Sequence, residues 1–352
     1  FDIRGNAIDQ TTDKTVADSS GVELLTTRTF IHNENINARG DAAVQTITTQ
    51  TTDDTGLETT LMVTSYQVMT NRRFDGRHNV MNQMSYNYDV KDGELLDISE
   101  IRSAGHTSSG VAKVQDVVTF DANGVDVIES KHIVNSSISS SGNVGVSTID
   151  IYTGASMATP GADLITMTGR IEHQVINTTG FDLRGNALEQ DITKTYYDLG
   201  LEIGTDVQII SNLAYGIHDR TSGSTIKNYE VIEGSRSFVD TQVISYLLYD
   251  RYGNAEHQTI DTYDSDTALT DEFLTSKKDI VNTYGEITVE LPGGGTETRS
   301  EAFARKHGSA LTTTSRETDK NDAFIQESVT ESTLFDIRGN AIDQTTDKTV
   351  AD

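Results

Sequence analysis

Short polar turns alternate along the chain with longer segments in which apolar and polar residues are interspersed. Leu24–Phe30, Leu61–Met69 and Val239–Leu248 are examples of these segments, which are rich in Thr, Val, Ile and Tyr. Such β-branched and aromatic residues suit the pleated surface of a strand. The turns carry Gly, Asn and Asp, which adopt positive φ or accept backbone hydrogen bonds. The pattern therefore predicts an all-β chain that reads turn, strand, turn, strand.

Helical periodicity is weak throughout the sequence. Asp271–Asn282 is the one stretch with a plausible helical period, and we interpret it as a strand as well. Ser136–Gly142 and Thr153–Asp163 are predicted to be longer loops because they are rich in Ser, Gly and Ala. No stretch has the composition of a linker between independent domains.

One phrase recurs along the whole chain. Phe1–Asp18 and Phe335–Asp352 are identical and begin 334 residues apart (335 − 1), which chance does not produce. Looser copies begin at Phe74, Phe181 and Tyr249. About ten units of roughly 33 residues fill the chain, a periodicity typical of solenoids and arrays. We interpret residues 1–334 as one full repeat of about ten hairpin units, and residues 335–352 as the start of the next identical repeat.

Certain positions of the phrase recur at a fixed spacing. A partial copy begins at Ile36, and faint copies of the turn lie at Thr283–Gly285 and Lys306–Gly308. The turn glycine and the residue after it recur at Gly5, Gly40, Gly185, Gly253, Asn6, Asn186 and Asn254. A glutamine recurs at Gln10, Gln45, Gln83, Gln115, Gln190 and Gln258. Ligand sites rarely recur in every unit, whereas packing positions do, so we predict that these residues hydrogen-bond neighbouring strands.

Two topologies are compatible with this recurrence. In a stacked-coil β-solenoid Gln10 and Gln45 would be immediate neighbours and bond directly, whereas in an antiparallel meander a return strand would separate them. Recurring Gln favours stacked coils, but the short Gly-bearing turns favour hairpins. We predict tandem antiparallel β-hairpin repeats that form one long curling sheet, tube or solenoid, with the stacked-coil β-solenoid as the alternative.

Composition restricts the core and the partners. Hydrophobic residues make up 35% of the chain, below the 45–50% (part of it Gly) that is typical of globular domains, so a thick aliphatic core is not expected. The net charge of −27 repels nucleic acid and anionic lipid. No run of eighteen apolar residues occurs, so we expect no membrane insertion. Cysteine is absent, which excludes disulfides and thiolate metal sites.

The sequence YDRYGN at Tyr249–Asn254 resembles the core of a YD repeat, as in Rhs and related wall-associated proteins, and FDIRGN and FDLRGN are close variants. The resemblance implies hairpin turns of a long antiparallel sheet that spirals into a hollow shell. It also implies two sets of turn residues. Aromatic residues would pack beside the turns at Phe1, Phe74, Phe181 and Tyr249, and aspartates would hydrogen-bond across them at Asp2, Asp75, Asp182 and Asp250. The units here are longer than is typical of the family, so longer strands are expected. No toxin domain or self-cleaving protease core is visible, so an encapsulation role is not inferred.

Candidate catalytic residues lie in Gly154–Pro160, which resembles the segment around the nucleophile of subtilisin-like proteases. Asp54, His106 and Ser156 follow that family's order of Asp, His and Ser. A triad needs its base within hydrogen-bond reach of the nucleophile. Asp54 and His106 belong to turns that the repeat already explains, and Gly161 replaces the family's His after Pro. We therefore expect no enzyme activity.

Two further motifs have binding interpretations. Arg39–Gly40–Asp41 is the integrin-type RGD tripeptide, but it occupies the same register as Arg4–Gly5–Asn6, so turn geometry accounts for it. The acidic turns could offer oxygen ligands to Ca²⁺, although their spacing matches no known calcium loop. These turns lie at Asp53–Asp54, Asp264–Asp266 and Asp319–Asp322. We expect no dedicated cofactor and at most weak Ca²⁺ binding there.

The repetition favours a structural function. We predict a repeat protein that lies outside the cell or at its surface and forms a filament, tube or sheath, with copies of itself as partners. The alternative is an adhesin or carbohydrate-binding stalk that binds surface glycans. A filament needs alike units on every contacting face, whereas an adhesin needs a distinctive tip.

Overall fold

The computed structural model describes residues 1–156, 165–291 and 294–351. It consists of one sheet of 21 strands with two short helices. The first strands are β1 (Asp9–Ala17), β2 (Glu23–Ile36), β3 (Ala42–Thr51), β4 (Met62–Phe74), β5 (Val80–Tyr88), β6 (Leu95–Ala104), β7 (Val114–Asp121), β8 (Val127–Ile138), β9 (Val144–Ser156) and β10 (Thr166–Phe181). The 3₁₀ turn η1 (Glu58–Thr60) precedes β4. The later elements are β11 (Ala187–Asp198), β12 (Leu201–Asn212), β13 (Gly223–Ile232), β14 (Ser235–Tyr249), β15 (Ala255–Tyr263), β16 (Leu274–Thr283), β17 (Ile287–Glu290), β18 (Thr296–Arg299), α1 (Glu301–His307), β19 (Thr312–Thr318), β20 (Phe324–Phe335) and β21 (Ala341–Val350).

The sheet is an antiparallel meander. Each strand from β1 to β15 pairs with the next strand along the chain, and β16 then pairs with β19, β19 with β20, and β20 with β21. The predicted all-β class and the hairpin topology are confirmed, and the stacked-coil alternative is wrong. Strand β2 lies between Gln10 and Gln45, because Gln10 is opposite Ile31 and Gln45 is opposite Asn33. Among the described strands, β1 and β21 each pair along one edge alone, so the sheet is open.

An insertion interrupts the meander between β16 and β19. It contains the antiparallel β17–β18 pair and α1, so the predicted turn copies at Thr283–Gly285 and Lys306–Gly308 are wrong. Ser300 begins the helix by accepting a hydrogen bond from the Phe303 backbone N–H, and Gly308 ends it at φ 69°. Short polar N-caps and left-handed glycine C-caps are the usual helix boundaries. Phe303 and Ala304 form the buried face of this helix.

Two loop predictions need correction. Ser136–Ile138 belongs to β8, and the chain reverses in a tight turn from Ser139 to Asn143 because Gly142 adopts φ 96°. Thr153–Ser156 belongs to β9, and the rest of that predicted loop, Met157–Asp163, lies outside the described residues. The strand interpretation of Asp271–Asn282 is confirmed for Leu274 onward.

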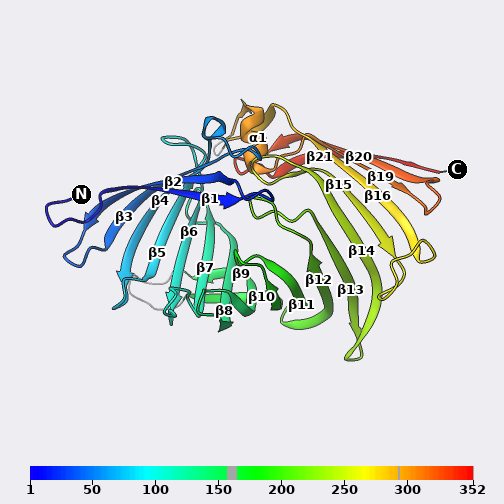
Figure 1. Cartoon of the computed structure of the whole chain (residues 1–352), viewed down its shortest axis with the longest axis horizontal. Coiled ribbons are helices and arrows are strands. Elements are labelled where there is room, and N and C mark those ends of the chain that lie inside the picture. The colour runs from blue at the N-terminus through cyan, green and yellow to red at the C-terminus, as the bar shows by residue number, and fades with distance from the viewer. Residues whose placement is uncertain (157–164, 292–293, 352) are drawn as a thin grey trace.

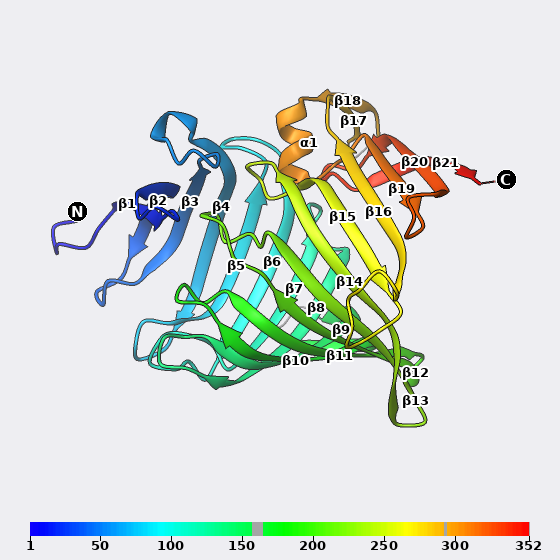
Figure 2. The ribbon, with the colours of Figure 1, turned by 45° about the vertical axis from the view of Figure 1, so that its right-hand side comes forward.

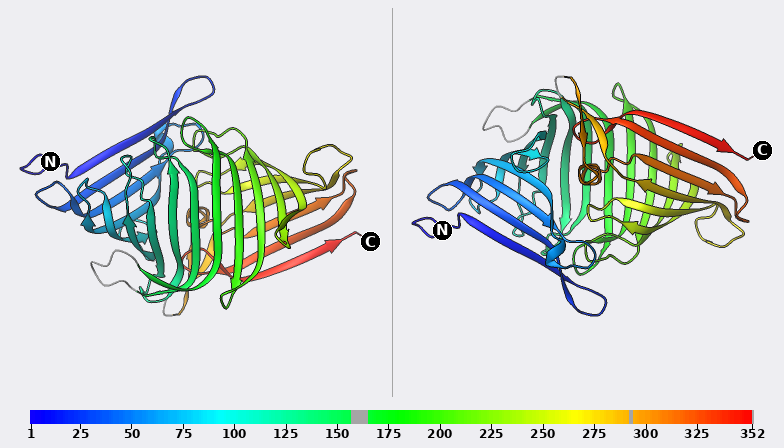
Figure 3. Two further views of the ribbon diagram at one scale, coloured as in Figure 1. Left: turned by 90° about the horizontal axis from the view of Figure 1, so that it is seen from below. Right: turned by 90° about the horizontal axis from the view of Figure 1, so that it is seen from above.

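The sheet curls into an open shell, with the two termini at opposite ends of its long axis (Figure 1, Figure 3). In Figure 2, α1 lies at the upper rim of the shell, with β3–β6 on one side of it and β15 and β16 on the other. Buried hydrophobic residues are few, and their larger cluster joins Ile287, Val289, Phe303, Ala304, Phe335 and Ile337. Most strands are half-buried in a single layer, so hydrogen bonds and cross-strand pairs hold most of the structure.

Candidate functional site: aligned turns, amide rows and a seam

Turns of one design follow each other along one edge of the shell. In each, the backbone N–H of the first residue donates to the carbonyl of the fifth, and the N–H of the fourth donates to the carbonyl of the first. The distances are 2.8 and 3.0 Å in Asp2–Asn6, 2.9 and 3.1 Å in Asp182–Asn186, and 3.0 and 3.1 Å in Asp250–Asn254. The same pattern recurs in Asn37–Asp41, Asp75–Asn79, Thr107–Val111, Ser139–Asn143, Gly216–Arg220 and Asp336–Asn340.

The fourth residue of each turn has positive φ. The angle is 85° at Gly5, 91° at Gly40, 91° at Gly185 and 99° at Gly253. Glycine adopts this conformation without steric penalty. The neighbouring turn also approaches closely, because a Cβ at Gly185 would lie 2.8 Å from Oδ1 of Asn143. The four predicted glycines therefore occupy equivalent positions. At Gly185, and at Gly40 where a Cβ would lie 3.1 Å from Asn6 Oδ1, the neighbouring turn adds a second reason for glycine.

Where a turn begins with a polar residue, the side chain of that residue caps it. One carboxylate oxygen of Asp75 accepts from the backbone N–H groups of Arg77 and Asn79 at 2.7 and 3.0 Å, and the other accepts from the Asn79 side-chain amide at 2.8 Å. The Asn79 side chain is the largest of the causes that lower the pKa of Asp75 to about 2. Asp2 with Asn6, Asp182 with Asn186 and Asp250 with Asn254 make the same bonds. The aspartates implied by the YD resemblance thus lie across their turns.

The RGD tripeptide belongs to a turn in which the cap is inverted. Asn37 takes the position of Asp and Asp41 that of Asn, and the Asn37 amide donates to Asp41 at 3.0 Å. Asp41 is buried and also contacts His78 Nδ1 at 2.5 Å. A buried and doubly bonded aspartate is not presented to a receptor, so the tripeptide is a turn.

Arginine side chains link one turn to the next. The third residue of a turn reaches a carbonyl of the following turn or of the residue just before it, at 2.7 Å for Arg4 to Ile36, 2.9 Å for Arg39 to Asp75 and 2.8 Å for Arg184 to Gly216. Arg77 reaches His106 in the same way. Guanidinium groups suit this bridging because they present several donors in a fixed plane. These arginines align the turns into a continuous edge.

Side-chain amides form a row across the first strands. Gln45 donates to Asn33 at 2.9 Å, Asn71 donates to Gln45 at 2.9 Å, and Gln83 donates to Asn71 at 2.8 Å. Elsewhere the recurring glutamine meets a hydroxyl, with Gln115 bonded to Ser103 and Gln190 to Thr178. In the described chain no hydrogen bond involves the side chain of Gln10 or Gln258. The recurring glutamines therefore bond to residues of the strand that lies between them, and not directly to each other.

The residues that sequence reasoning missed are the asparagines of that intervening strand. Each donates to the carbonyl of the alanine two residues after the turn glycine. The pairs are Asn33 to Ala7 at 3.0 Å, Asn71 to Ala42 at 3.1 Å, Asn135 to Ala112 at 3.0 Å, Asn212 to Ala187 at 2.9 Å and Asn282 to Ala255 at 2.8 Å. We call this contact the asparagine clasp. A detectable signal existed, because Asn33 and Asn71 each lie 12 residues before the recurring Gln.

A buried ion cluster lies among the middle strands. Arg102 and Glu100 are almost fully buried and are joined at 2.7 Å, and Arg72 binds both Glu100 oxygens at 2.9 Å. Asp116 lies opposite Arg102 in the sheet and contacts His132 Nδ1 at 2.6 Å. Buried charges are tolerated when they are paired in this way. Each of these charges faces one of the opposite sign within the cluster, which is the property of a structural network.

A seam joins distant parts of the shell. The β3–β4 and β5–β6 connections contact the Gly216–Arg220 turn, the β14–β15 turn and α1. The contacts include His218 to the Asp53 carbonyl at 3.2 Å, Arg251 to the Thr60 carbonyl at 2.6 Å and Lys306 to Asp89 at 3.3 Å. Lys14 of β1 adds a pair with Asp219 at 2.6 Å. Arg299 pairs with Glu94 beside them. A pocket of about 330 Å³ opens at this seam, and its cationic lining is already bonded to carboxylates and carbonyls. The seam therefore joins segments of the curled sheet that are far apart in the sequence.

The three protease candidates have separate partners. The Ser156 hydroxyl donates to the Thr166 carbonyl at 3.3 Å, His106 contacts Asp75 at 3.6 Å, and Asp54 contacts His218 at 3.8 Å. Met157–Pro160, the remainder of the subtilisin-like segment, lies outside the described residues. The structure does not bring these three residues into a triad.

The acidic turns bond chiefly within themselves. Asp319 accepts from the backbone N–H groups of Asn321 and Ala323 at 2.8 Å each, and Asp53 accepts from Thr55. Within residues 1–156, 165–291 and 294–351, no cluster of three or more acidic, His or Cys side chains has a metal-binding arrangement. No helix in the same residues is long and apolar enough to cross a membrane.

Comparison with known proteins gives limited similarity. No family model matches the chain, and no curated protein matches it. The crystal structure of TcdB2–TccC3 aligns with 96% of this chain and 24% of its own, at 9% identity and a TM-score of 0.18. The crystal structure of TcdB2–TccC3–Cdc42 aligns with 96% of this chain and 22% of its own, at 12% identity and a TM-score of 0.15. The chain thus spans about a quarter of the length of these structures.

Proposed function

We propose that this chain is a unit of a structural scaffold, one repeat of a polymer that forms an extracellular filament, tube or sheath. The observation that carries the proposal is the equivalence of the identical segments. Turn Asp2–Asn6 and turn Asp336–Asn340 have the same pair of backbone hydrogen bonds, at 2.8 and 3.0 Å in both. Their Asp caps accept from Arg4 and Arg338 at 2.8 Å in both. The sheet can therefore continue beyond β21 with the geometry with which it starts at β1.

The thin core also favours a scaffold. Each strand contacts mainly its sequence neighbours, so stability sums over units and sets no limit to length. The net charge of −27 keeps such a polymer soluble and discourages lateral clumping.

The test is to make proteins with one, two and three tandem copies of residues 1–334, each followed by residues 335–352, and to image them by cryo-electron microscopy. We expect one continuous sheet whose length grows by the same increment with each copy. Separate beads joined by flexible chain would contradict the proposal. Immunogold labelling of the native material tests the location outside the cell.

A second candidate function, glycan binding, is favoured by one pocket. It has a volume of about 400 Å³ and combines Phe30 and Tyr66 with polar groups of Asp9, His32 and Lys91. Aromatic walls with a few polar groups are typical of small-ligand sites. A glycan array with the native chain tests it. Binding that Phe30→Ala and Tyr66→Ala abolish, and that Phe273→Ala preserves, would support this function.

A further inference from the structure

The pocket at the seam differs from the rest of this acidic chain in the charge of its lining. Its volume is about 330 Å³, and every side chain that lines it can donate a hydrogen bond. Threonines and one tyrosine make up half of the lining, and no aspartate or glutamate is among them. A chain with 54 acidic and 27 basic residues is expected to surround its basic groups with carboxylates, so this lining is unusual. The basic groups are Lys14, His218, Arg220, Arg251 and Lys306.

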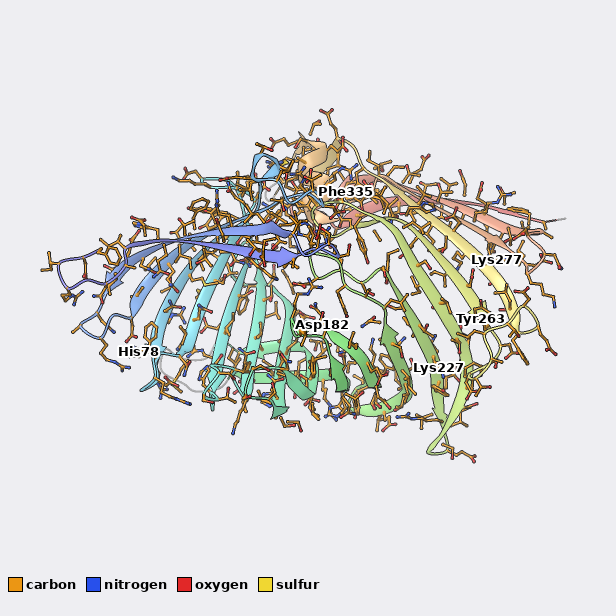
Figure 4. All side chains as sticks on the ribbon, viewed as in Figure 1. His78, Asp182, Lys227, Tyr263, Lys277 and Phe335 are labelled. Atoms are coloured by element: carbon orange, nitrogen blue, oxygen red, sulfur yellow. The ribbon has the colours of Figure 1, made fainter. Side chains whose placement is uncertain are left out.

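Segments from distant parts of the chain build the pocket. Strands β2–β4 give the threonines, and the Gly216–Arg220 turn, the β14–β15 turn and α1 give most of the other groups. Arg184 links the Gly216–Arg220 turn to the turn that begins at Asp182, which Figure 4 labels near the middle of the shell. Lys14 of β1 is already paired with Asp219 at 2.6 Å, so its charge is balanced.

Two arginines of the pocket keep their charge without a carboxylate partner. Arg220 donates to the carbonyls of Asp250 and Arg251 at 2.6 Å each. Arg251 donates to the Thr60 carbonyl at 2.6 Å. In the described chain neither guanidinium forms a salt bridge, and Nε and Nη2 of Arg251 make no hydrogen bond. A carbonyl satisfies a donor but leaves the positive charge in place. Other arginines pair with carboxylates, as at Arg28, Arg184 and Arg305.

Burial makes this positive charge costly. It is the largest of the causes that act on Arg220, and it lowers the pKa of that guanidinium. The side chain of His218 is 5% exposed, and the carboxylate that contacts it, Asp54 at 3.8 Å, is 75% exposed. A charge removed from water is stabilised by an ion of opposite sign at hydrogen-bond distance. An anion in the pocket would supply the negative charge that the lining lacks.

We propose that this pocket is a binding site for a tetrahedral oxyanion, a phosphate or sulfate group that is either free or carried by a sugar. Guanidinium groups bind such anions through two donors at once. The threonine hydroxyls and the Tyr252 hydroxyl suit the remaining oxygens or the hydroxyls of an attached sugar. The volume of the pocket lies within the range of small-ligand sites. The bound anion would hold β2–β4 to the two turns and so stabilise the seam. This inference does not depend on the proposed scaffold function.

Calorimetric titration and thermal unfolding of the full chain test the proposal. The probes are inorganic phosphate, inorganic sulfate, glucose 6-phosphate and glucose, at constant ionic strength with chloride as the balancing anion. We expect saturable binding of the three anions, none of glucose, and a melting temperature that rises with the concentration of each anion. Tighter binding of glucose 6-phosphate than of inorganic phosphate would assign the group to a sugar, and the reverse order would assign it to the free ion. Absence of saturable binding of all three anions would overturn the proposal.

A pair of arginine variants locates the binding. Arg220→Gln/Arg251→Gln removes both unpaired charges and should weaken anion binding by about tenfold or more, because charge-assisted hydrogen bonds are lost. The matched variant Arg170→Gln/Arg236→Gln removes the same number of charges from β10 and β14, outside the pocket, and should bind like the native chain. Equal affinities of the two variants would overturn the proposal.

A variant that gains stability keeps the test decisive if the arginine variant does not fold. Thr27 of β2 lines the pocket, so Thr27→Asp places a carboxylate where the anion would bind. This variant should melt at a higher temperature than the native chain in chloride and should no longer bind phosphate. Thr29→Asp lies on the same face of β2 but outside the pocket. It should melt at a lower temperature, because it adds to the net negative charge, and it should still bind phosphate. A less stable Thr27→Asp that binds phosphate like the native chain would overturn the proposal.

Discussion

Asn71 and Gln83 lie opposite each other on β4 and β5, and the Gln83 amide donates to the Asn71 side-chain oxygen at 2.8 Å. Asn71 is 4% exposed and itself donates to the Ala42 carbonyl and to Gln45. One asparagine therefore joins three consecutive strands by side-chain bonds that add to the backbone ladder. Because the sheet has little hydrophobic core, such residues are expected to contribute much of its resistance to unfolding.

Asn71→Ala removes that junction. We expect it to lower the free energy of unfolding by about 1–3 kcal/mol, because Ala42, Gln45 and Gln83, which are half-buried, each lose a hydrogen-bond partner. Urea titration followed by circular dichroism measures the change. Gln50→Ala is the matched control, since Gln50 is half-buried on β3 and its side chain makes no hydrogen bond in the described chain. A change within about 0.5 kcal/mol in both variants would contradict the role of the clasp.

The sequence predicts the recurring glutamine but not the asparagine to which it bonds, for a physical reason. Gln83 recurs at a fixed distance from its turn because both belong to the same tight hairpin arm. The separation between the alanine carbonyl and its asparagine spans the far turn and varies from 23 to 29 residues among the clasps. Far turns of different length hide the asparagine from a search at a fixed distance after the alanine, although Asn71 could have been found 12 residues before Gln83.

The helix and the seam were harder to predict from sequence. Helix α1 has seven residues, too short for a periodic signal to stand out, although the Ser300 cap and Gly308 mark its ends. The seam joins Asp89 to Lys306, which are 217 residues apart in the chain. Local propensity and turn chemistry carry no information about contacts at that separation. They arise from the accumulated curl of the sheet, which the sequence specifies strand by strand.

Gly185→Ala tests the stacking of the turns. We expect it to destabilise by more than about 1 kcal/mol, because alanine is strained at φ 91° and its Cβ would meet Asn143. Gly200→Ala should cost less, since Gly200 has φ 82° but no heavy atom near its would-be Cβ. Gly76→Ala should be close to neutral, because that glycine has neither constraint. Thermal unfolding gives the ranking, and equal effects at the three positions would show that the turns do not stack.

Glu100→Gln tests the buried ion cluster. We expect a loss of about 3 kcal/mol, because the almost fully buried Arg102 loses the carboxylate that it contacts at 2.7 Å. Glu129→Gln is the control, since Glu129 pairs with Lys131 at 2.7 Å in a partly exposed position. Such surface pairs contribute about 0–1 kcal/mol. Denaturant titration that gives the two variants similar midpoints would contradict a stabilising role for the cluster.

The capped turns predict that the stability of the fold falls as the solution becomes acidic. The Asn79 side chain, together with backbone N–H groups, lowers the pKa of Asp75 from 3.8 to about 2. A carboxyl with a lowered folded pKa contributes stability that is present above its unfolded pKa and is lost as pH falls through the folded pKa. The melting temperature should therefore fall between about pH 4 and pH 2, where the turns lose their caps. Carbon NMR of the Asp75 carboxyl should also show a pKa that rises toward 3.8 in Asn79→Ala, and an unchanged value would exclude this cause.

The seam predicts a coupling between residues far apart in the sequence. The side chains of Asp89 and Lys306 are 14% and 10% exposed and lie 3.3 Å apart, at the place where α1 meets the β5–β6 connection. Asp89→Asn and Lys306→Met should therefore show a coupling free energy of about 1 kcal/mol in a double-mutant cycle. Each variant should also speed amide exchange in the β5–β6 connection and in α1, because the spiral loosens there, while exchange in β10–β12 stays unchanged. Lys277 and Asp322 form the control pair, since they lie 2.7 Å apart on neighbouring hairpins with Asp322 exposed, and they should couple by less than about 0.5 kcal/mol. Additive effects at Asp89 and Lys306, or exchange that rises throughout the sheet, would mean that this pair does not hold α1 to the β5–β6 connection.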